Sequence, residues 1–380
     1  MEAAIEGLAS KWRTERAERQ ARRQLDKSDF NALREAGLWR SVVPTDVGGS
    51  WVDAAHSARP LCNSLRRLAG ADSSVTLVSA MHPAVISFWL ANPDPSQPDW
   101  EQQRAAIFAS AAAGEQWGTV TSEPGSGGDI ALTRAVAAPT DASLSLPGRS
   151  YAVTGDKHFG SGLGVSDWMM TTAIPDGESA AAVFVLDVRD WQSNPRVQLL
   201  GEWDGMGMAS TQSHAVRLDG VPAVRMARDE PLEQILAASG PFVLLLFTAV
   251  ITGILDEAIA TARVQLEPKA DQLRAYERVE WSRAEQDHWL ATQAYEGALR
   301  TLETGDRASA EHAARRAKQS VAGLAEDTLQ RLTRVLGGGT FSRRSPFAHW
   351  YEDVRALGFL RPPWGLAYDA LFATSFGVHD

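Results

Sequence analysis

The chain has 380 residues, of which 44% are hydrophobic and 22% charged, and its formal net charge is −10. This composition is typical of a globular protein rather than a disordered one, and the length predicts two or three lobes that share a continuous core. The acidic balance argues against nucleic acid as a partner. Cys62 is the only cysteine, which excludes intramolecular disulfides and zinc–cysteine sites and is typical of a protein from a reducing cytoplasm. We expect Cys62 to be buried as a small hydrophobic residue.

The start of the chain lacks the apolar core of a secretory signal. Its arginines between positions 13 and 23 alternate with Glu15 and Glu18 and predict a solvated helix face. No apolar run reaches the roughly 18 residues that a membrane span needs. The run from Pro241 to Leu255 comes closest and is predicted to be a buried core helix, so no membrane partner is expected.

Residues 1–115 have the pattern of helices separated by short breaks. An Asp/Ser start and a closing glycine predict a helix between Leu25 and Gly37. Two more helices are expected at about 57–68 and 73–90, the second largely apolar and therefore buried. Pro93 to Pro98 should interrupt this pattern.

Residues 116–228 change to short alternating runs with frequent glycine, proline and aspartate. Such a block predicts an antiparallel β-barrel or sandwich, with strands expected at Ala131–Ala137, Ser143–Leu146, Tyr151–Thr154, Trp168–Ala173, Ala181–Leu186 and Ser213–Leu218. Residues 229–380 are helical again, with helices predicted over 232–266, 273–303 and 308–336. The fold class is therefore α+β, with three domains at 1–115, 116–228 and 229–380.

Two glycine-rich stretches lie within the β-region. The first runs from Trp117 to Asp129, and its Gly125, Gly127 and Gly128 would let the backbone approach a flat or anionic ligand. The second runs from Val153 to Gly162 and contains Ser161, whose hydroxyl could hydrogen-bond the edge of a cofactor. The alternative interpretation is a pair of ordinary hairpin turns.

These features together resemble one known family. The helical–β–helical order is similar to that of the acyl-CoA dehydrogenase superfamily. So are three sequence motifs: Thr-Ser-Glu-Pro-Gly-Ser-Gly-Gly-Asp at 121–129, Thr-Gly-Asp-Lys-His-Phe-Gly-Ser at 154–161, and Gly337-Gly338 followed by Ser345-Pro-Phe and Glu352-Asp-Val-Arg355. The resemblance implies a C-terminal four-helix bundle and a homotetramer or homodimer. It also implies FAD between the β-domain and the C-terminal helices, with part of the site supplied by a neighbouring subunit.

The resemblance also assigns cofactor-binding roles. Ser122, beside Thr121, stands at the position of a hydroxyl that bonds the flavin pyrimidine ring in this family. Phe159 stands at the position of an aromatic residue that covers one face of the flavin. Ser161 stands at the position of a hydroxyl that lies near N5. Such groups give an isoalloxazine an apolar wall and stabilise negative charge on the reduced ring. In the loop that contains Gly127, Gly128 replaces the usual serine, so one contact is missing.

Two departures from the family pattern concern residues that would bind the phosphate groups of the cofactor. Arg334 precedes Gly337 and Gly338 where the family has glutamine, and it could bind phosphate or act only as a cation at a helix C-terminus. Gln265 stands where an arginine usually reaches a neighbour's pyrophosphate, although Lys269 could substitute. FAD is the expected cofactor, and FMN is the alternative.

The largest departure is at the chemistry. Oxidation of an acyl thioester needs a carboxylate that removes the α-proton while a hydride passes to flavin N5. The two positions from which the family takes this glutamate carry Arg361 and Ser239 here. Glu233 could serve as a displaced base only if the helix register differs from this count along the sequence. Otherwise it is a solvated residue in the first turn of its helix.

Three functions therefore remain open. The first is dehydrogenation of an acyl-CoA or related substrate, with an electron-transfer partner and with Arg361 facing the substrate or flavin; Arg361 could instead be an outward surface arginine. The second is a two-component monooxygenase, which takes reduced flavin from a reductase, forms a flavin hydroperoxide and needs no α-proton base. Here His82 is the leading histidine candidate, ahead of His158 and His379, although each histidine also fits an ordinary core or surface residue. The third is a catalytically silent homologue that assembles with an active paralogue. No metal site is predicted.

Overall fold

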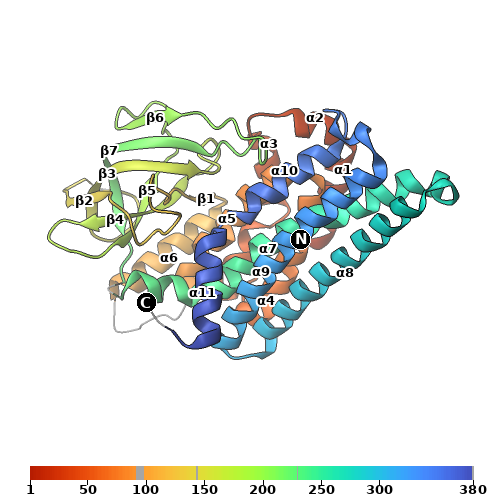
Figure 1. Ribbon diagram of the computed structural model, residues 1–380. Coiled ribbons are helices and arrows are strands. Elements are labelled where there is room, and N and C mark those ends of the chain that lie inside the picture. Colours follow the sequence, from red (N-terminus) through yellow and green to blue (C-terminus); the bar gives the residue numbers. More distant parts are fainter. Residues whose placement is uncertain (91–97, 143, 229, 379–380) are drawn as a thin grey trace.

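The computed structural model describes residues 1–90, 98–142, 144–228 and 230–378. Helices come first, strands follow and helices return, so the fold is mixed α+β as predicted, with the strands gathered at one end of the molecule (Figure 1). The first helices are α1 (Glu2–Thr14), α2 (Arg16–Ala21), α3 (Lys27–Glu35), α4 (Ala54–Ala71), α5 (Ser73–Leu90) and α6 (Pro98–Ala113), with 3-10 turns η1 (Trp39–Val42) and η2 (Thr45–Val47). Most of the expected Pro93–Pro98 break lies outside the described residues.

Local signals explain where these helices begin and what they bury. The Asp26 side chain accepts a hydrogen bond from the Ser28 N–H at the start of α3, at 2.8 Å. Helix α5 has the predicted bounds and is buried along nearly its whole length, because it is apolar on every side. Cys62 is a buried free thiol, as predicted.

The prediction of a solvated arginine face in the N-terminal segment is wrong for Arg19. This side chain is buried, with Nε 2.9 Å from Asp72 Oδ2 and Nη2 2.8 Å from Asp29 Oδ2. Sequence spacing identified the helix but could not identify carboxylates that reach it from α3 and from the α4–α5 junction.

The strands form a closed barrel. They are β1 (Trp117–Thr119), β2 (Val136–Pro139), β3 (Ser150–Gly160), β4 (Trp168–Pro175), β5 (Ala182–Asp187), β6 (Val197–Gly201) and β7 (His214–Arg225). Pairing runs β4–β2–β3–β7–β5 and returns from β5 to β4, while β1 joins β4 and β6 joins β7. The barrel alternative therefore holds over the sandwich, but the sheet is mixed, because β1 and β2 both pair with β4 in parallel.

Two predicted strands are wrong over described residues. The segment expected at 131–137 becomes a strand only at Val136, because the N–H groups of Arg134 and Ala135 bond the Glu123 carboxylate at 2.7 and 3.3 Å instead of a neighbouring strand. Residues 144–146 form no strand, and Ser143 lies outside the described residues. Strand β6 was not predicted, because its exposed leucines give no alternation between buried and exposed residues.

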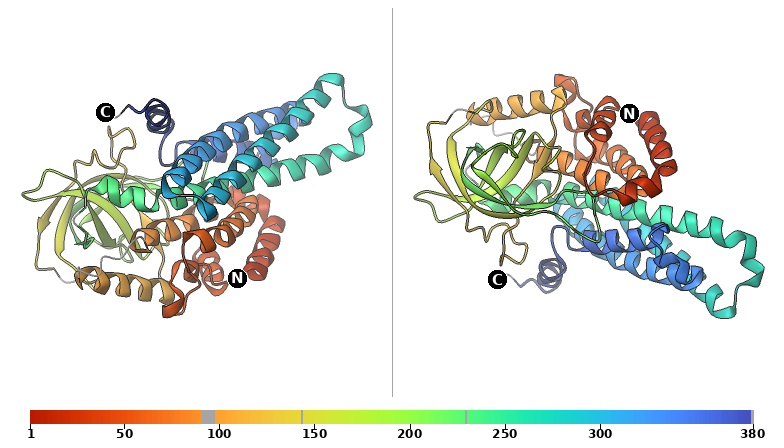
Figure 2. Two further views of the ribbon diagram at one scale, coloured as in Figure 1. Left: turned by 90° about the horizontal axis from the view of Figure 1, so that it is seen from below. Right: turned by 90° about the horizontal axis from the view of Figure 1, so that it is seen from above.

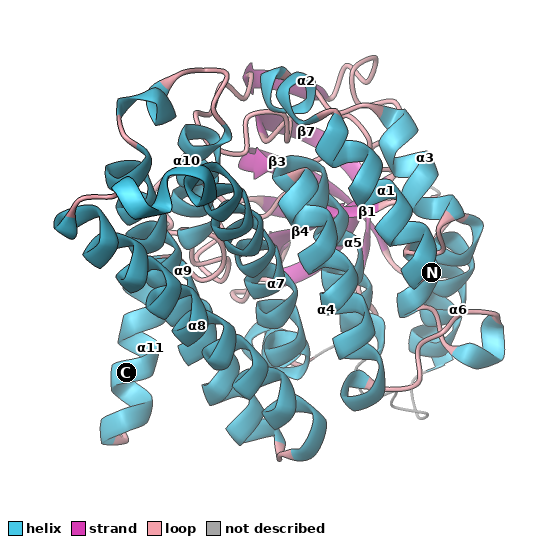
Figure 3. Ribbon diagram, turned by 90° about the vertical axis from the view of Figure 1, so that its right-hand side faces the viewer, coloured by secondary structure: helices cyan, strands magenta, loops and turns pink. Residues whose placement is uncertain are grey.

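The C-terminal helices follow the barrel, and the first of them packs against α4 and α5. They are α7 (Leu232–Leu266), α8 (Ala275–Thr304), α9 (Arg307–Leu336), α10 (Pro346–Gly358) and α11 (Trp364–Phe376), with 3-10 turns η3 (Glu267–Gln272) and η4 (Gly338–Phe341). The turn between α7 and α8 lies far from the strands (Figure 2). Figure 3 shows α4, α7 and α8 in front of the strands.

Two helices are long and apolar enough to cross a membrane by length and composition alone. They are α5 and the segment that begins with α7, and 89% and 72% of their most apolar windows are buried inside the protein. Core helices pass the same test, and the predicted buried run from Pro241 to Leu255 lies within α7.

Candidate functional site

A cavity of about 460 Å³ lies between the barrel and the segment that joins α10 to α11. Its volume is within the usual range of roughly 300–1,000 Å³ for small-molecule sites. Its walls come from α5, the glycine-rich loop, the end of β3, the loop before β7 and the segment after α10: Leu77, Met81, Thr119, Ser122, Glu123, Gly127, Gly128, Phe159, Ser161, Trp203, Met208, Ser213, Ala356, Phe359, Leu360, Arg361 and Pro363.

Under the glycine-rich loop lies a buried ion pair. Lys157 Nζ donates to Glu123 Oε1 and, at 2.6 Å, to the Thr172 carbonyl. Burial would raise the pKa of Glu123, but hydrogen bonds from Lys157, Thr133 and the Arg134 N–H hold it below its usual value. The Glu123 carboxylate is thus ionised and its acceptor positions are occupied.

Aromatic side chains form an apolar wall. Phe159 is 57% exposed and has a φ of +56°, a conformation that non-glycine residues rarely adopt. Its ring meets Trp203 edge-on, with centroids 6.0 Å apart and an interplanar angle of 78°. Phe359, 66% exposed, lines the same cavity. This wall can accept a flat aromatic ligand.

Hydroxyl groups supply the polar part of the lining. Ser122 and Ser161 lie on it, and Ser161 Oγ is 2.8 Å from Ser213 Oγ. The Thr119 hydroxyl is buried and has no hydrogen-bond partner among the described residues. A buried unpaired hydroxyl is costly, so this group points to a ligand that would satisfy it.

Arg361 brings a positive charge to the cavity. Its guanidinium donates to Thr121 Oγ1, and no carboxylate within the described chain forms an ion pair with it. Loss of water around the group lowers its pKa to about 10, so it stays charged near neutral pH. The Arg361 charge also disfavours protonation of Lys157, whose pKa is lowered chiefly by burial.

Pro363 explains why glycine occupies position 128. A Cβ on Gly128 would lie 2.5 Å from Pro363 Cγ, and the residue has a φ of +91°. A serine at this position has no room beside Pro363. The glycine at position 128, where the family has serine, therefore packs directly against Pro363, two residues after Arg361.

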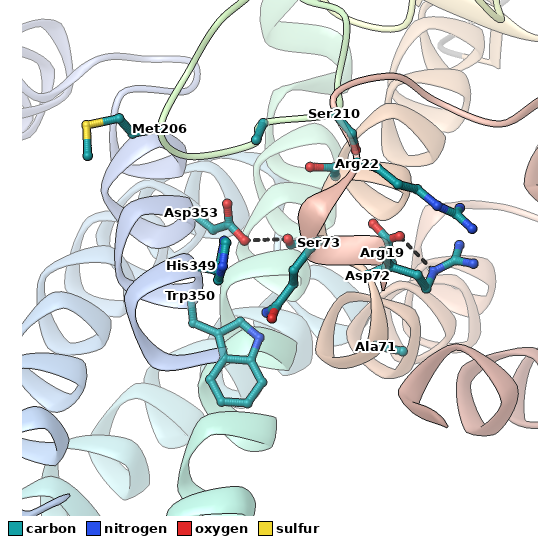
Figure 4. A pocket seen from close by; sticks show the side chains of 13 residues that line it. Arg19, Arg22, Ala71, Asp72, Ser73, Met206, Ser210, His349, Trp350 and Asp353 are labelled. Carbon is teal, nitrogen blue, oxygen red and sulfur yellow. Dashed lines mark hydrogen bonds and ion pairs between the residues drawn. The ribbon is translucent and has the colours of Figure 1, made fainter. Parts of the chain in front are cut away.

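Asp353 fixes the loop that precedes β7. One carboxylate oxygen accepts the Met208 N–H at 2.6 Å, and the other accepts Ser73 Oγ at 2.5 Å. Figure 4 shows Asp353 and Ser73 meeting beside a separate small pocket, next to the Arg19–Asp72 pair. Burial raises the pKa of Asp353 to about 6. Asp353 thereby ties α10 and α5 to the loop that carries Trp203, Met208 and Ser213.

His82 lies outside the cavity lining, although the sequence suggests it as the leading histidine. It is fully buried, with Nδ1 accepting the Trp117 N–H at 3.2 Å and Nε2 lying 3.3 Å from the Trp39 carbonyl. Burial lowers its pKa to about 3. Its position is that of a neutral core histidine. His158 is not part of the lining either, and His379 lies outside the described residues.

Other predicted residues also lie apart from the cavity of this chain. Glu233 is exposed in the first turn of α7, while Ser239 Oγ donates to the Ser87 carbonyl at 3.0 Å. Arg334 is exposed and bonds Glu280 at 3.1 Å, and Gly337 and Gly338 follow it at the end of α9. Their role at a neighbouring subunit's cofactor stays a prediction.

Residues of the lining that were not predicted from the sequence include the loop residues Trp203, Met208 and Ser213, and also Phe359. A signal was present in Trp-Asp-Gly-Met-Gly-Met at 203–208, where closely spaced glycines accompany large apolar residues. Within the described chain, no group of three or more His, Cys, Asp and Glu side chains could hold a metal ion.

No protein-family model matches the chain. It is 28% identical over 361 residues to the amino sugar nitrososynthase DnmZ of Streptomyces peucetius, covering 88% of this chain and 82% of that one. It is 23% identical over 370 residues to YdbM of Bacillus subtilis (strain 168), a protein named as a candidate acyl-CoA dehydrogenase, covering 94% and 91%.

A solved structure extends this likeness to the fold. The crystal structure of FMN-bound TdsC, a dibenzothiophene monooxygenase from Paenibacillus sp. A11-2, superposes with a TM-score of 0.78 at 20% identity, covering 98% of this chain and 96% of that one. The fold agrees over nearly the full length of both chains. The chain thus has the acyl-CoA dehydrogenase fold and is similar in sequence to flavoproteins of that superfamily.

Proposed function

We propose that the chain is a flavin-dependent monooxygenase that binds FMN in the cavity between the barrel and the α10–α11 segment. A separate reductase supplies the FMN in reduced form, in the cytoplasm. Bound reduced FMN would supply two electrons, and with two protons one atom of O₂ would be transferred to a small organic substrate while the other would be released as water.

The absence of an available carboxylate carries this proposal. Among the described lining residues Glu123 is the one carboxylate, and Lys157, Thr133 and two backbone N–H groups occupy it. Removal of an α-proton needs a base that can reach the substrate carbon. Arg361 is a cation, and Glu233 lies on the surface. The lining thus favours oxygen transfer over dehydrogenation of an acyl thioester.

The lining residues also fit an isoalloxazine ring. Phe159 offers an apolar face, Ser122 and Ser161 offer hydroxyls, and the Thr119 hydroxyl lacks a partner. Arg361 would lie where it can stabilise negative charge on the ring. Bound FMN would supply the redox chemistry, while these side chains would hold and orient it.

The relatives support FMN and oxygen transfer. TdsC was crystallised with FMN, and DnmZ is a nitrososynthase. FMN is the proposed cofactor because a structural neighbour holds it, while the roles of Arg334, Gly337 and Gly338 at a neighbouring subunit's cofactor stay a prediction.

Rapid mixing tests this function. The purified protein is loaded with photoreduced FMN under anaerobic conditions and then mixed with O₂, while absorbance is recorded. We expect a transient absorbance that decays more slowly than free reduced FMN reoxidises. An amino sugar or an aromatic thioether, as substrate, should shorten the lifetime of this transient. Reoxidation at the rate of free FMN, or bleaching of the oxidised complex by an acyl-CoA alone, would contradict the proposal; the second result would support the dehydrogenase.

A further inference from the structure

Three hydroxyl groups form a chain that leads from the cavity wall into the protein. Ser161 Oγ is 2.8 Å from Ser213 Oγ, and Ser213 Oγ is 2.7 Å from Thr211 Oγ1. Thr211 Oγ1 donates to the Met208 carbonyl at 2.8 Å. Ser161 and Ser213 line the cavity, whereas Thr211 is fully buried behind it.

The Met208 carbonyl sets the direction of this chain, because a carbonyl can only accept. A hydroxyl has one proton to donate and two lone pairs that accept. Thr211 uses its proton on Met208, so Ser213 must donate to Thr211, and Ser161 must then donate to Ser213. The Ser161 proton therefore points into the wall, and toward the cavity the Ser161 oxygen can only accept a hydrogen bond.

The backbone around Thr211 holds this arrangement. Met208 and Gln212 both have positive φ, at +53° and +48°, and such strained residues persist only where their surroundings determine them. The Met208 carbonyl also accepts Trp203 Nε1 at 2.8 Å, and the Met208 N–H is held by Asp353. The acceptor at the end of the chain is thus fixed by two other segments.

A hydroxyl that can only accept distinguishes the two redox states of a flavin. N5 of the oxidised ring is an acceptor, whereas N5 of the reduced ring carries a hydrogen and donates. The positive charge of Arg361 also favours binding of the reduced flavin, because the reduced ring is an anion near neutral pH and the oxidised ring is neutral.

We propose that Thr211, acting through Ser213, is the positioning residue that sets the preference of this cavity for reduced over oxidised flavin. The inference rests on the proposed function, in that the flavin N5 edge must face Ser161. It names the residue behind a property that a two-component enzyme needs, since oxidised flavin in the surroundings would otherwise compete for the site.

The test measures two affinities for each full-length protein. Oxidised FMN is titrated in air and photoreduced FMN under anaerobic conditions, and the midpoint potential of bound FMN provides an independent value. For the wild type we expect at least tenfold tighter binding of reduced FMN. Each tenfold preference raises the two-electron midpoint potential above that of free FMN by about 30 mV.

Substitutions at Thr211 isolate the hydroxyl chain from direct contact with the ligand. Thr211→Val removes the proton donor to Met208, which frees Ser213 to donate to Ser161 and Ser161 to donate to oxidised N5. We expect the preference to fall about tenfold, whereas Thr211→Ser, which keeps the hydroxyl, retains it. Thr252→Val is the matched control, because Thr252 is an equally buried threonine within α7 whose hydroxyl donates to the Thr248 carbonyl and lies on no part of the described cavity lining.

Each result has a defined meaning. A wild type that binds oxidised FMN as tightly as reduced FMN overturns the inference while leaving the flavin site in place. A folded Thr211→Val protein with the wild-type ratio overturns the role of Thr211. If Thr211→Val does not fold, Ser213→Ala should lower the preference in the same way, and an unchanged ratio there overturns the chain. Absence of binding in both redox states contradicts the proposed function itself.

Discussion

Gly128 and Pro363 are in such close contact that a Cβ on Gly128 would lie 2.5 Å from Pro363 Cγ. The glycine-rich loop and the segment after α10 therefore fit together only because position 128 has no side chain. Since Arg361 lies two residues before Pro363, this contact helps to fix the one cation whose side chain faces the cavity among the described residues.

Gly128→Ala is expected to destabilise the protein more than Gly127→Ala. Both residues have positive φ, which costs an alanine about 1–2 kcal/mol. Only position 128 adds a clash with Pro363, worth about 1–3 kcal/mol more, because nothing lies within 4 Å of a Cβ on Gly127. Urea denaturation of the two variants measures the difference. Equal losses would mean that the Pro363 contact relaxes freely.

Arg361→Gln is expected to weaken binding of reduced FMN by tenfold or more, since it removes a partly desolvated charge that no carboxylate balances. Arg361→Lys should retain most of the affinity. Arg355→Gln is the matched control, because Arg355 is an exposed arginine of α10 paired with Glu352. Anaerobic titration with photoreduced FMN provides the comparison.

Two other results would change the role of Arg361. Unaltered FMN affinity with a raised KM for substrate would assign the cation to an anionic group of the substrate. Gain of acyl-CoA oxidation with an artificial electron acceptor in Arg361→Glu would indicate a dehydrogenase site that is otherwise intact.

His82 should make stability depend on pH. Its folded pKa is lowered to about 3 by burial, while the unfolded histidine has a pKa near 6.5. The unfolded chain thus binds a proton that the folded chain refuses, and stability falls as pH drops from about 6.5 toward 3. The loss between pH 7 and pH 5 is about 2 kcal/mol.

The comparison is between wild type and His82→Gln. Urea midpoints at pH 7 and pH 5 should differ less in the variant than in the wild type. Asp353, whose pKa is raised to about 6, titrates in both proteins and cancels in the difference. Identical pH dependence in the two proteins would show that the pKa of His82 is the same in the folded and unfolded states.

Lys157→Met is expected to cost about 3–5 kcal/mol, because it leaves the Glu123 carboxylate buried without its cation. Arg217→Met, which breaks the exposed Arg217–Asp156 pair between β7 and β3, should change stability little. Thermal denaturation of both variants provides the measurement. Similar losses would mean that water reaches Glu123.

The sequence predicted those parts of the site whose residues are neighbours along the chain. Ser122, Phe159 and Ser161 belong to two short motifs, and the same motifs identified Gly127 and Gly128 on the lining. The bounds of α5 and α7 followed from apolar runs that ended at clear breaks. Local pattern sufficed in these cases, because the decisive contacts are local.

Other parts depend on contacts between distant segments. The hydrogen bond from the Met208 N–H to Asp353 spans 145 residues, and it brings the loop of Trp203 and Ser213 to the cavity. His82 is buried because Trp39 and Trp117 pack around it. Arg19 is buried because two carboxylates meet it. No periodicity within one element carries this information.

Equilibrium binding of reduced FMN to the wild-type protein tests the central claim most directly. Photoreduced FMN is titrated under anaerobic conditions, and the fluorescence of Trp203, which lines the cavity, reports occupancy against a Trp203→Phe control. We expect saturable one-to-one binding, with a component of the quenching that the control lacks. A protein that stays colourless and binds neither redox state of FMN would contradict it and would support the catalytically silent homologue.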